Sequence, residues 1–205
     1  SRFSVDGVRA LTPLVVALNM ATVVGLFMFS FYPSTPSHVF GLFLDNMAAI
    51  QSKRLLLVLF FAVLVLNHFV TKAQKDTLLL LTFSLLAILM LLASNDFFLL
   101  FLAIELLALS SYCLVALPKT LKSLEAALKY FSVGVLSASF LLYGTFFFFY
   151  LHETTSFFAG PSKLYVLPTQ FGMVALCIFL VAAFFIKLGI APFHYWVADV
   201  YEGSP

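Results

Sequence analysis

The sequence predicts an all-α integral membrane protein, and two observations lead to that prediction. Hydrophobic residues make up 63% of the 205-residue chain, charged residues make up only 10%, and the mean hydropathy is +1.10. Soluble globular proteins average about 25% charged residues, so this composition excludes that class. The apolar runs are also about as long as a helix needs to cross a bilayer, and longer than barrel strands.

Six membrane-spanning helices are predicted from these apolar runs and from the residues that interrupt them. The turn-forming segment YPSTPS ends the first span, and the basic link TKAQKD separates the second from the third. The residues SND at 94–96 can cap the fourth helix, and Pro118 ends it because proline cannot donate the next backbone hydrogen bond. The predicted spans are 8–31, a second span that starts between 45 and 53 and ends near 70, 77–93, 97–117, 121–151 and 169–190.

The last span is expected to be broken near Gly189–Pro192. The residues that follow, HYWVADVYEGSP, have the pattern of further amphipathic helical turns and not of an aqueous tail. Broken helices in membranes occur where the exposed backbone lines protein or a wet cavity. Because no repeat, low-complexity tract or soluble segment interrupts the chain, residues 1–205 are expected to form a single transmembrane domain.

Basic residues in the links predict the orientation of these spans. The links on the side of both termini carry six basic residues, and the opposite links carry three: Arg2, Arg9, Lys72, Lys75, Lys119 and Lys122 against Lys53, Arg54 and Lys163. The excess of positive charge predicts that both termini lie on the matrix or cytoplasmic side.

Glu105 carries the only charge between residues 97 and 117. At about 1.5 Å of rise per residue, its carboxyl lies about 13 Å deep in the bilayer. A carboxylate at that depth costs several kcal/mol unless it is neutral, paired or hydrated. It could gain and lose a proton, or act on a neighbouring lysine through its charge. The alternative is a neutral carboxyl hydrogen-bonded to Ser110, to Ser111 or to a neighbouring helix.

Lys187 poses the same problem in the last apolar segment. Burial favours its neutral amine whereas a nearby carboxylate favours the ammonium, so a lysine under both influences can switch its protonation. The alternative is a lysine that reaches the membrane interface, since Pro192 follows closely. We predict that Glu105 and Lys187 face each other, because each is more stable at mid-membrane beside the other.

Other candidate residues have weaker patterns. Lys129 follows Glu125 by one helical turn, so the two can pair on one face, either as a structural ion pair or as members of a proton relay. His194 lies near a helix end, where a lone histidine is more often structural. The net charge of +2 without a basic cluster argues against nucleic acid as a partner. Because the chain has no CxxC motif, glycine-rich phosphate loop or haem-type histidine pair, we expect it to bind no redox cofactor and no metal.

Three strings also resemble a known family. FLAIELLALSSYCLVAL, SLEAALKYFSVGVLSASFLLYG and IKLGIAPFHYWVADVYEGSP occur in the order found in subunit 2 of the proton-pumping NADH:ubiquinone oxidoreductase, respiratory complex I. The resemblance covers about residues 91–205. Its most specific element is PFHxW…D…YEGxP, whereas the lysine before PFH is shared with the wider antiporter-like family.

The resemblance implies roles for the candidate residues. Glu105 matches the acidic residue of the family's fifth helix and Lys187 the lysine of its broken seventh helix, which together form a half-channel pair. Lys129 matches a sixth-helix lysine implicated in the same half-channel, and we expect Glu125, Pro192 and His194 to support these three. Electron transfer from NADH through FMN and iron–sulfur clusters to ubiquinone would take place in other subunits.

The resemblance also implies partners and a location. The partners would be lipids and the other membrane-arm subunits. The reduced and apparently split form predicts the mitochondrial inner membrane as the location, and a plastid or bacterial membrane is the alternative. Family members contain one more helix before these spans and several after them, so we expect a complementary chain that carries those helices and a further mid-membrane lysine. Two alternatives are a non-pumping structural subunit and a subunit of a related multisubunit cation/proton antiporter, against which the YEGSP ending argues.

Overall fold

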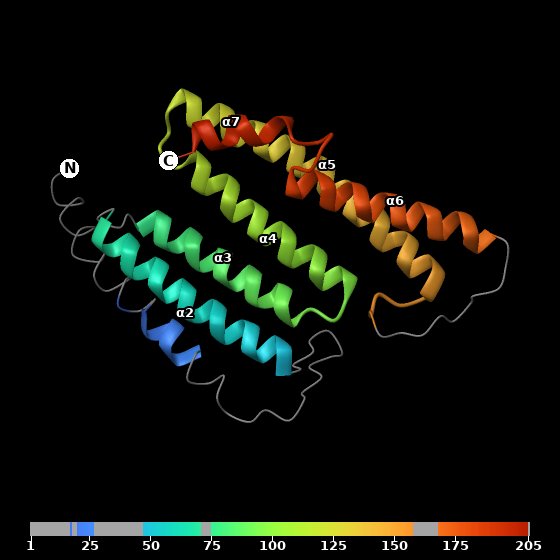
Figure 1. Cartoon of the computed structure of the whole chain (residues 1–205), viewed down its shortest axis with the longest axis horizontal. Helices are drawn as coiled ribbons and strands as arrows, with labels where there is room; N and C mark the ends of the chain where they lie inside the picture. Colours follow the sequence, from blue (N-terminus) through green and yellow to red (C-terminus); the bar gives the residue numbers. More distant parts are fainter. Residues whose placement is uncertain (1–16, 18–19, 27–46, 71–74, 158–167, 205) are drawn as a thin grey trace, which may run out of the picture.

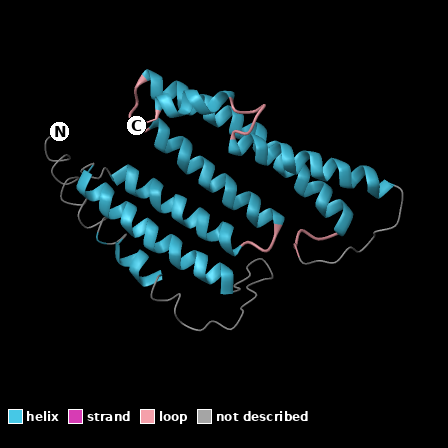
Figure 2. Cartoon of the chain, in the orientation of Figure 1, coloured by secondary structure: helices cyan, strands magenta, loops and turns pink. Residues whose placement is uncertain are grey.

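A computed structural model describes residues 17, 20–26, 47–70, 75–157 and 168–204. Its named helices are α2 (Met47–Val70), α3 (Lys75–Ala93), α4 (Phe97–Ala116), α5 (Leu121–His152), α6 (Pro168–Leu188) and α7 (Tyr195–Gly203). Residues 20–26 are also helical. The described residues form helices joined by loops and contain no strand, as Figure 2 shows. The all-helical fold class is therefore confirmed.

Four of these helices are long and apolar enough to cross a membrane, namely α3, α4, α5 and α6. The predicted ends of these four helices agree with the observed ones to within about two residues. The first predicted span lies mostly outside the described residues, and α2 is not among the four. The multi-spanning architecture is confirmed, and the predicted number of six spans is not.

The helices pack in two groups that meet at α4 (Figure 1). Helices α2, α3 and α4 lie side by side, and the most extensive contact between two of the named helices is that of α5 with α6. Helix α7 lies along the first half of α5, and α4 also packs on α5. The 32 residues of α5 exceed the length that spans a hydrocarbon core, so this helix tilts or projects beyond it.

Local hydrogen bonds explain where α4 and α5 begin. The Asp96 carboxylate caps α4 by accepting a hydrogen bond of 2.7 Å from the backbone N–H of Phe98, as the SND motif predicts. The Thr155 hydroxyl donates to the other carboxylate oxygen of Asp96, so the turn before α4 is bonded to the residues that follow α5. At the opposite end, Thr120 and Ser123 form a reciprocal capping box that starts α5.

The predicted break between α6 and α7 is confirmed. Helix α6 ends at Leu188, and Gly189 has a φ of +62°, a left-handed conformation that favours glycine. A Cβ atom at position 189 would also lie 2.5 Å from Cγ2 of Val197. After a cis peptide bond between Ala191 and Pro192, the chain resumes its helix at Tyr195. The break therefore separates two helical segments that follow one another beside α5.

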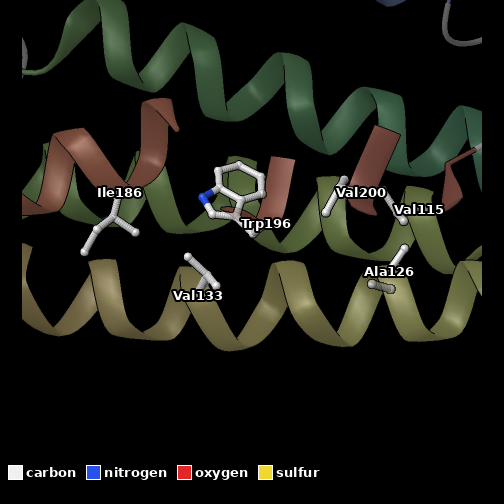
Figure 3. Close-up of a cluster of buried hydrophobic side chains, with 7 residues drawn as sticks. Val115, Ala126, Val133, Ile186, Trp196 and Val200 are labelled. Atoms are coloured by element: carbon white, nitrogen blue, oxygen red, sulfur yellow. The ribbon is translucent and has the colours of Figure 1, made fainter. Parts of the chain in front are cut away.

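A small apolar core holds α4, α5, α6 and α7 together (Figure 3). Its side chains come from all four helices and are at most 9% exposed: Val115, Ala126, Ala127, Val133, Ile186, Trp196 and Val200. Many large apolar side chains elsewhere are exposed, among them Leu128 at 68% and Phe171 at 76%. In a membrane these surfaces face lipid or neighbouring subunits, so their exposure does not oppose folding.

Candidate functional site

The structure brings Glu105 of α4 and Lys187 of α6 into direct contact. The Nζ atom of Lys187 donates a hydrogen bond of 2.8 Å to Oε1 of Glu105, and the two groups form an ion pair. The lysine side chain is 19% exposed and the glutamate side chain 22% exposed. The prediction that these two residues face each other is confirmed.

The two partners occupy different places on their helices. Glu105 lies near the middle of α4, far from both of its ends. Lys187 lies one residue before the end of α6, directly ahead of the break at Gly189. The carboxylate is thus fixed on a continuous helix, whereas the ammonium sits on a helix end, where a small rearrangement of the break would move it.

This geometry gives Glu105 a partner on a neighbouring helix, Lys187, and leaves the nearby serine hydroxyls bonded elsewhere. The hydroxyls of Ser110 and Ser111 donate to the carbonyl oxygens of Leu106 and Leu107, at 2.9 Å each, and not to Glu105. The amine of Lys187 is directed toward Glu105. Both groups therefore act as an ion pair within the helix bundle.

A cavity of about 310 Å³ adjoins the lysine. Apolar side chains make most of its wall, and Lys187 shares the polar part with Ser111, Tyr130 and Ser137. The Ser137 hydroxyl is completely buried and donates 2.8 Å to the carbonyl oxygen of Ala183, which joins α5 to α6. A space of this size with several polar groups can hold water molecules next to the amine.

Three aromatic side chains, which the sequence analysis missed, connect α4, α5 and α7. The ring of Tyr130 stacks on Trp196 with centroids 4.9 Å apart, and Tyr112 meets Tyr130 edge to face at 4.6 Å. The Tyr112 hydroxyl occupies the space above Gly134, where a Cβ atom would come within 1.7 Å of it. Tyr112 follows Glu105 by two helical turns, and that spacing is the signal that could have identified it.

The structure does not bring Lys129 to the Glu105–Lys187 pair. Lys129 forms the predicted ion pair with Glu125, at 2.8 Å, and a second one with Asp199 of α7, at 2.7 Å. The Lys129 and Asp199 side chains are about half-exposed, at 45% and 47%, and that of Glu125 is 67% exposed. Asp199 was missed because nothing in the sequence shows that α7 folds back along α5.

The two supporting residues of the broken helix lie in the loop between α6 and α7. Pro192 and His194 are both exposed. His194 immediately precedes α7, and its side chain makes no capping hydrogen bond to that helix. Their supporting role stays a prediction.

Comparison with known proteins places this chain beside membrane subunits of respiratory complexes. Residues 94–205 match the family model described as NADH:quinone oxidoreductase/Mrp antiporter, TM. A curated relative, NADH-quinone oxidoreductase subunit N of Rhodospirillum rubrum, is 33% identical over 207 residues. The alignment covers 97% of this chain and 41% of the relative, and this chain spans less than half the length of the curated relatives it matches.

Chains in solved structures of membrane complexes also resemble this chain. A chain of respiratory complex I from Thermus thermophilus with bound aureothin has a TM-score of 0.69 and 27% identity. That match covers 98% of this chain and 43% of the other. A chain of the Mrp complex from Dietzia sp. DQ12-45-1b also has a TM-score of 0.69, over 98% of this chain and 40% of the other. Its 18% identity supports similarity of fold alone.

Proposed function

The chain belongs to the NADH:quinone oxidoreductase/Mrp antiporter transmembrane family, and from this premise we propose that it is a membrane-arm subunit of respiratory complex I. In that complex it would form part of a half-channel that translocates protons. The relatives named NADH-quinone oxidoreductase subunit N and the likeness to complex I support the choice of complex. The observation that supports the proton role is the enclosed ion pair of Glu105 and Lys187.

The ion pair has the features that proton transfer requires. Charges in a protein interior interact far more strongly than charges in water, so each partner stabilises the ionised form of the other. If Lys187 moves away from Glu105, or if charge nearby changes, the ammonium loses that stabilisation. Its proton can then pass to water in the adjacent cavity, with Ser111 and Tyr130 as hydrogen-bonding groups on the wall.

The location of Lys187 suggests how such a change is transmitted. The lysine is one residue from the end of α6 and two from Gly189, whereas Glu105 is held in the middle of α4. Rearrangement at the break can therefore change the distance between amine and carboxylate while α4 stays in place. Oxidation of NADH and reduction of the quinone would drive this rearrangement from other subunits, and FMN, iron–sulfur clusters and ubiquinone would be bound there.

The finer details of this assignment stay predictions. The relatives compared with this chain are bacterial, so a mitochondrial inner membrane, the matrix side for both termini and a complementary chain are not tested by them. The other partners proposed are the neighbouring membrane-arm subunits and lipids.

The test of the proposed function is the variant Lys187→Met in the complex reconstituted into vesicles. Methionine keeps length and apolar bulk and removes the amine. We expect the complex to assemble and proton transfer through this chain to fall by about a hundredfold or more, the effect of losing a positioned acid–base group. NADH-driven proton movement and quinone reduction are measured together. Unchanged pumping at normal quinone turnover would favour the structural, non-pumping alternative.

The related antiporter is the second candidate, favoured only by the fold shared with the Mrp complex. The two are separated by purifying the assembly through a tag on this chain. Co-purification of NADH:quinone reductase activity supports complex I. Cation-driven proton exchange without that activity would support the antiporter instead.

A further inference from the structure

We propose that Lys129 and Asp199 act as positioning residues: their ion pair clamps α7 onto α5 and so fixes the position of Lys187. On this account Lys129 does not itself carry protons. This proposal rests on the proposed function of the Glu105–Lys187 pair. It identifies the contacts that hold Lys187 in position beside Glu105. The clamp is defined as the ion pairs between α5 and α7, namely Lys129 with Asp199 and Lys122 with Glu202.

The clamp uses all the charged side chains of α7. The helix YWVADVYEG carries two acids, Asp199 and Glu202, and each contacts a lysine of α5. Lys122 and Lys129 are two turns apart on one face of α5, and the two acids are one turn apart on α7. The earlier lysine pairs with the later acid, as two antiparallel helices require. The order of the two pairs therefore fits an antiparallel arrangement of α7 and α5.

Close packing requires α7 to lie in this one position. A Cβ atom at Gly203 would come within 2.4 Å of the Ala126 Cβ and 3.0 Å of the Lys122 carbonyl oxygen, so the end of α7 touches the backbone of α5. Trp196 and Val200 bury the apolar side of α7 against the same helix, as Figure 3 shows. A helix of nine residues is not stable by itself, so these contacts with α5 maintain it.

The position of α7 in turn determines the geometry at Lys187. Val197 of α7 lies against Gly189, two residues after the lysine, where even a methyl group would not fit. The backbone N–H of Ile190 donates 3.0 Å to the Phe185 carbonyl, which ties the break to the last turn of α6. Movement of α7 along α5 would therefore be passed through the break to the helix end that carries Lys187.

The aromatic contacts provide a second connection. Trp196 of α7 stacks on Tyr130, and Tyr130 lines the cavity next to Lys187. Lys129 immediately precedes Tyr130 on α5, so the clamp and the cavity wall are adjacent in the chain. A displaced α7 would change both the position of the amine and the shape of the space beside it.

The surroundings of Lys129 favour a side chain that stays positively charged. Its ammonium lies 2.8 Å from a carboxylate oxygen of Glu125 and 2.7 Å from one of Asp199, so two acids stabilise its charged form. Lys187, by contrast, has one acid among its described ion-pair partners. A proton carrier must spend part of its cycle neutral, and the double pairing opposes that state.

The test compares four single variants in the reconstituted complex, with protons moved per electron as the readout. Lys129→Arg keeps the charge and both ion pairs but does not release a proton in the accessible pH range. Lys129→Gln and Asp199→Asn each break the Lys129–Asp199 pair of the clamp. We expect Lys129→Arg to pump normally, and the two clamp-breaking variants to lower the proton-to-electron ratio to a similar extent while quinone reduction continues. Lys187→Met reports separately on the proposed function.

The outcomes distinguish the two proposals. If Lys187→Met stops pumping while Lys129→Gln and Asp199→Asn leave it unchanged, the clamp is wrong and the proposed function stands. If Lys129→Arg stops pumping, Lys129 is a proton carrier and the clamp is overturned. If Lys187→Met leaves pumping intact, the proposed function itself fails. Where a clamp-breaking variant does not assemble, Lys129→Arg decides alone: normal pumping supports the clamp and its loss overturns it.

Discussion

Two lysines of this chain form ion pairs of almost the same length in different surroundings. Lys187 contacts Glu105 at 2.8 Å, with side chains 19% and 22% exposed. Lys129 contacts Asp199 at 2.7 Å, with side chains 45% and 47% exposed, and a second acid, Glu125, lies at 2.8 Å. The interior pair links α4 to the end of α6, whereas the exposed network links α5 to α7.

The difference shows that distance alone does not identify a proton-transfer group. Loss of one partner from a largely enclosed pair leaves an uncompensated charge in the protein interior, whereas a half-exposed pair is partly screened and contributes less to stability. The interior pair is therefore the one that we propose for proton transfer. The exposed network keeps its charge and determines position.

The largest effect on stability is expected from breaking the interior pair. Glu105→Gln leaves the Lys187 ammonium without its carboxylate and should destabilise the subunit by about 3 kcal/mol, the low end for a buried pair because some exposure remains. Thermal unfolding of the purified complex measures this loss. Adding Lys187→Met should recover most of it, since no charge then stays unpaired. If the double variant lost as much stability as the two single variants added together, Glu105 and Lys187 would not be energetically coupled.

A change in the packing of α7 should have an intermediate effect. Gly203→Ala places a methyl group against Ala126 and the Lys122 carbonyl, and should cost about 2 kcal/mol, as overpacking typically does. The matched control is Gly25→Ala, where no atom lies within 4 Å of the new Cβ and the helix should gain slightly. The comparison uses the same unfolding measurement. Equal effects at the two glycines would show that α7 does not pack on α5 as described.

The smallest effect is expected at the outer ion pair of the clamp. The Lys122 and Glu202 side chains are 61% and 69% exposed, so Lys122→Gln should cost less than about 1 kcal/mol. Because salt screens exposed charges, the cost should shrink as ionic strength rises, whereas that of Glu105→Gln should change little. Unfolding measured at low and high salt tests this difference. If the stability cost of Glu105→Gln also shrank as salt rises, the Glu105–Lys187 pair would be exposed to water, and the two ion pairs would not differ in their surroundings.

The sequence was sufficient for helices α3 to α6 and for the contact between Glu105 and Lys187. A lone acid and a lone base in apolar runs each require a partner, and few candidates exist, so Glu105 and Lys187 could be matched from their positions in the chain. Asp199 and Trp196 could not be placed in the same way. Their roles depend on how the chain folds back after Gly189 and Pro192, and the direction of a short helix after a break is set by tertiary packing and not by its own residues.

The most direct test of the whole account compares arginine at the two lysine positions. Arginine keeps the charge and the ion pair but does not release a proton in the accessible pH range. Protons moved per electron are measured in vesicles for the complex carrying Lys187→Arg and for the complex carrying Lys129→Arg. We predict that Lys187→Arg abolishes proton transfer through this chain and that Lys129→Arg preserves it. Normal pumping with Lys187→Arg, or its loss with Lys129→Arg, would contradict the division between a proton-transfer pair and a positioning network.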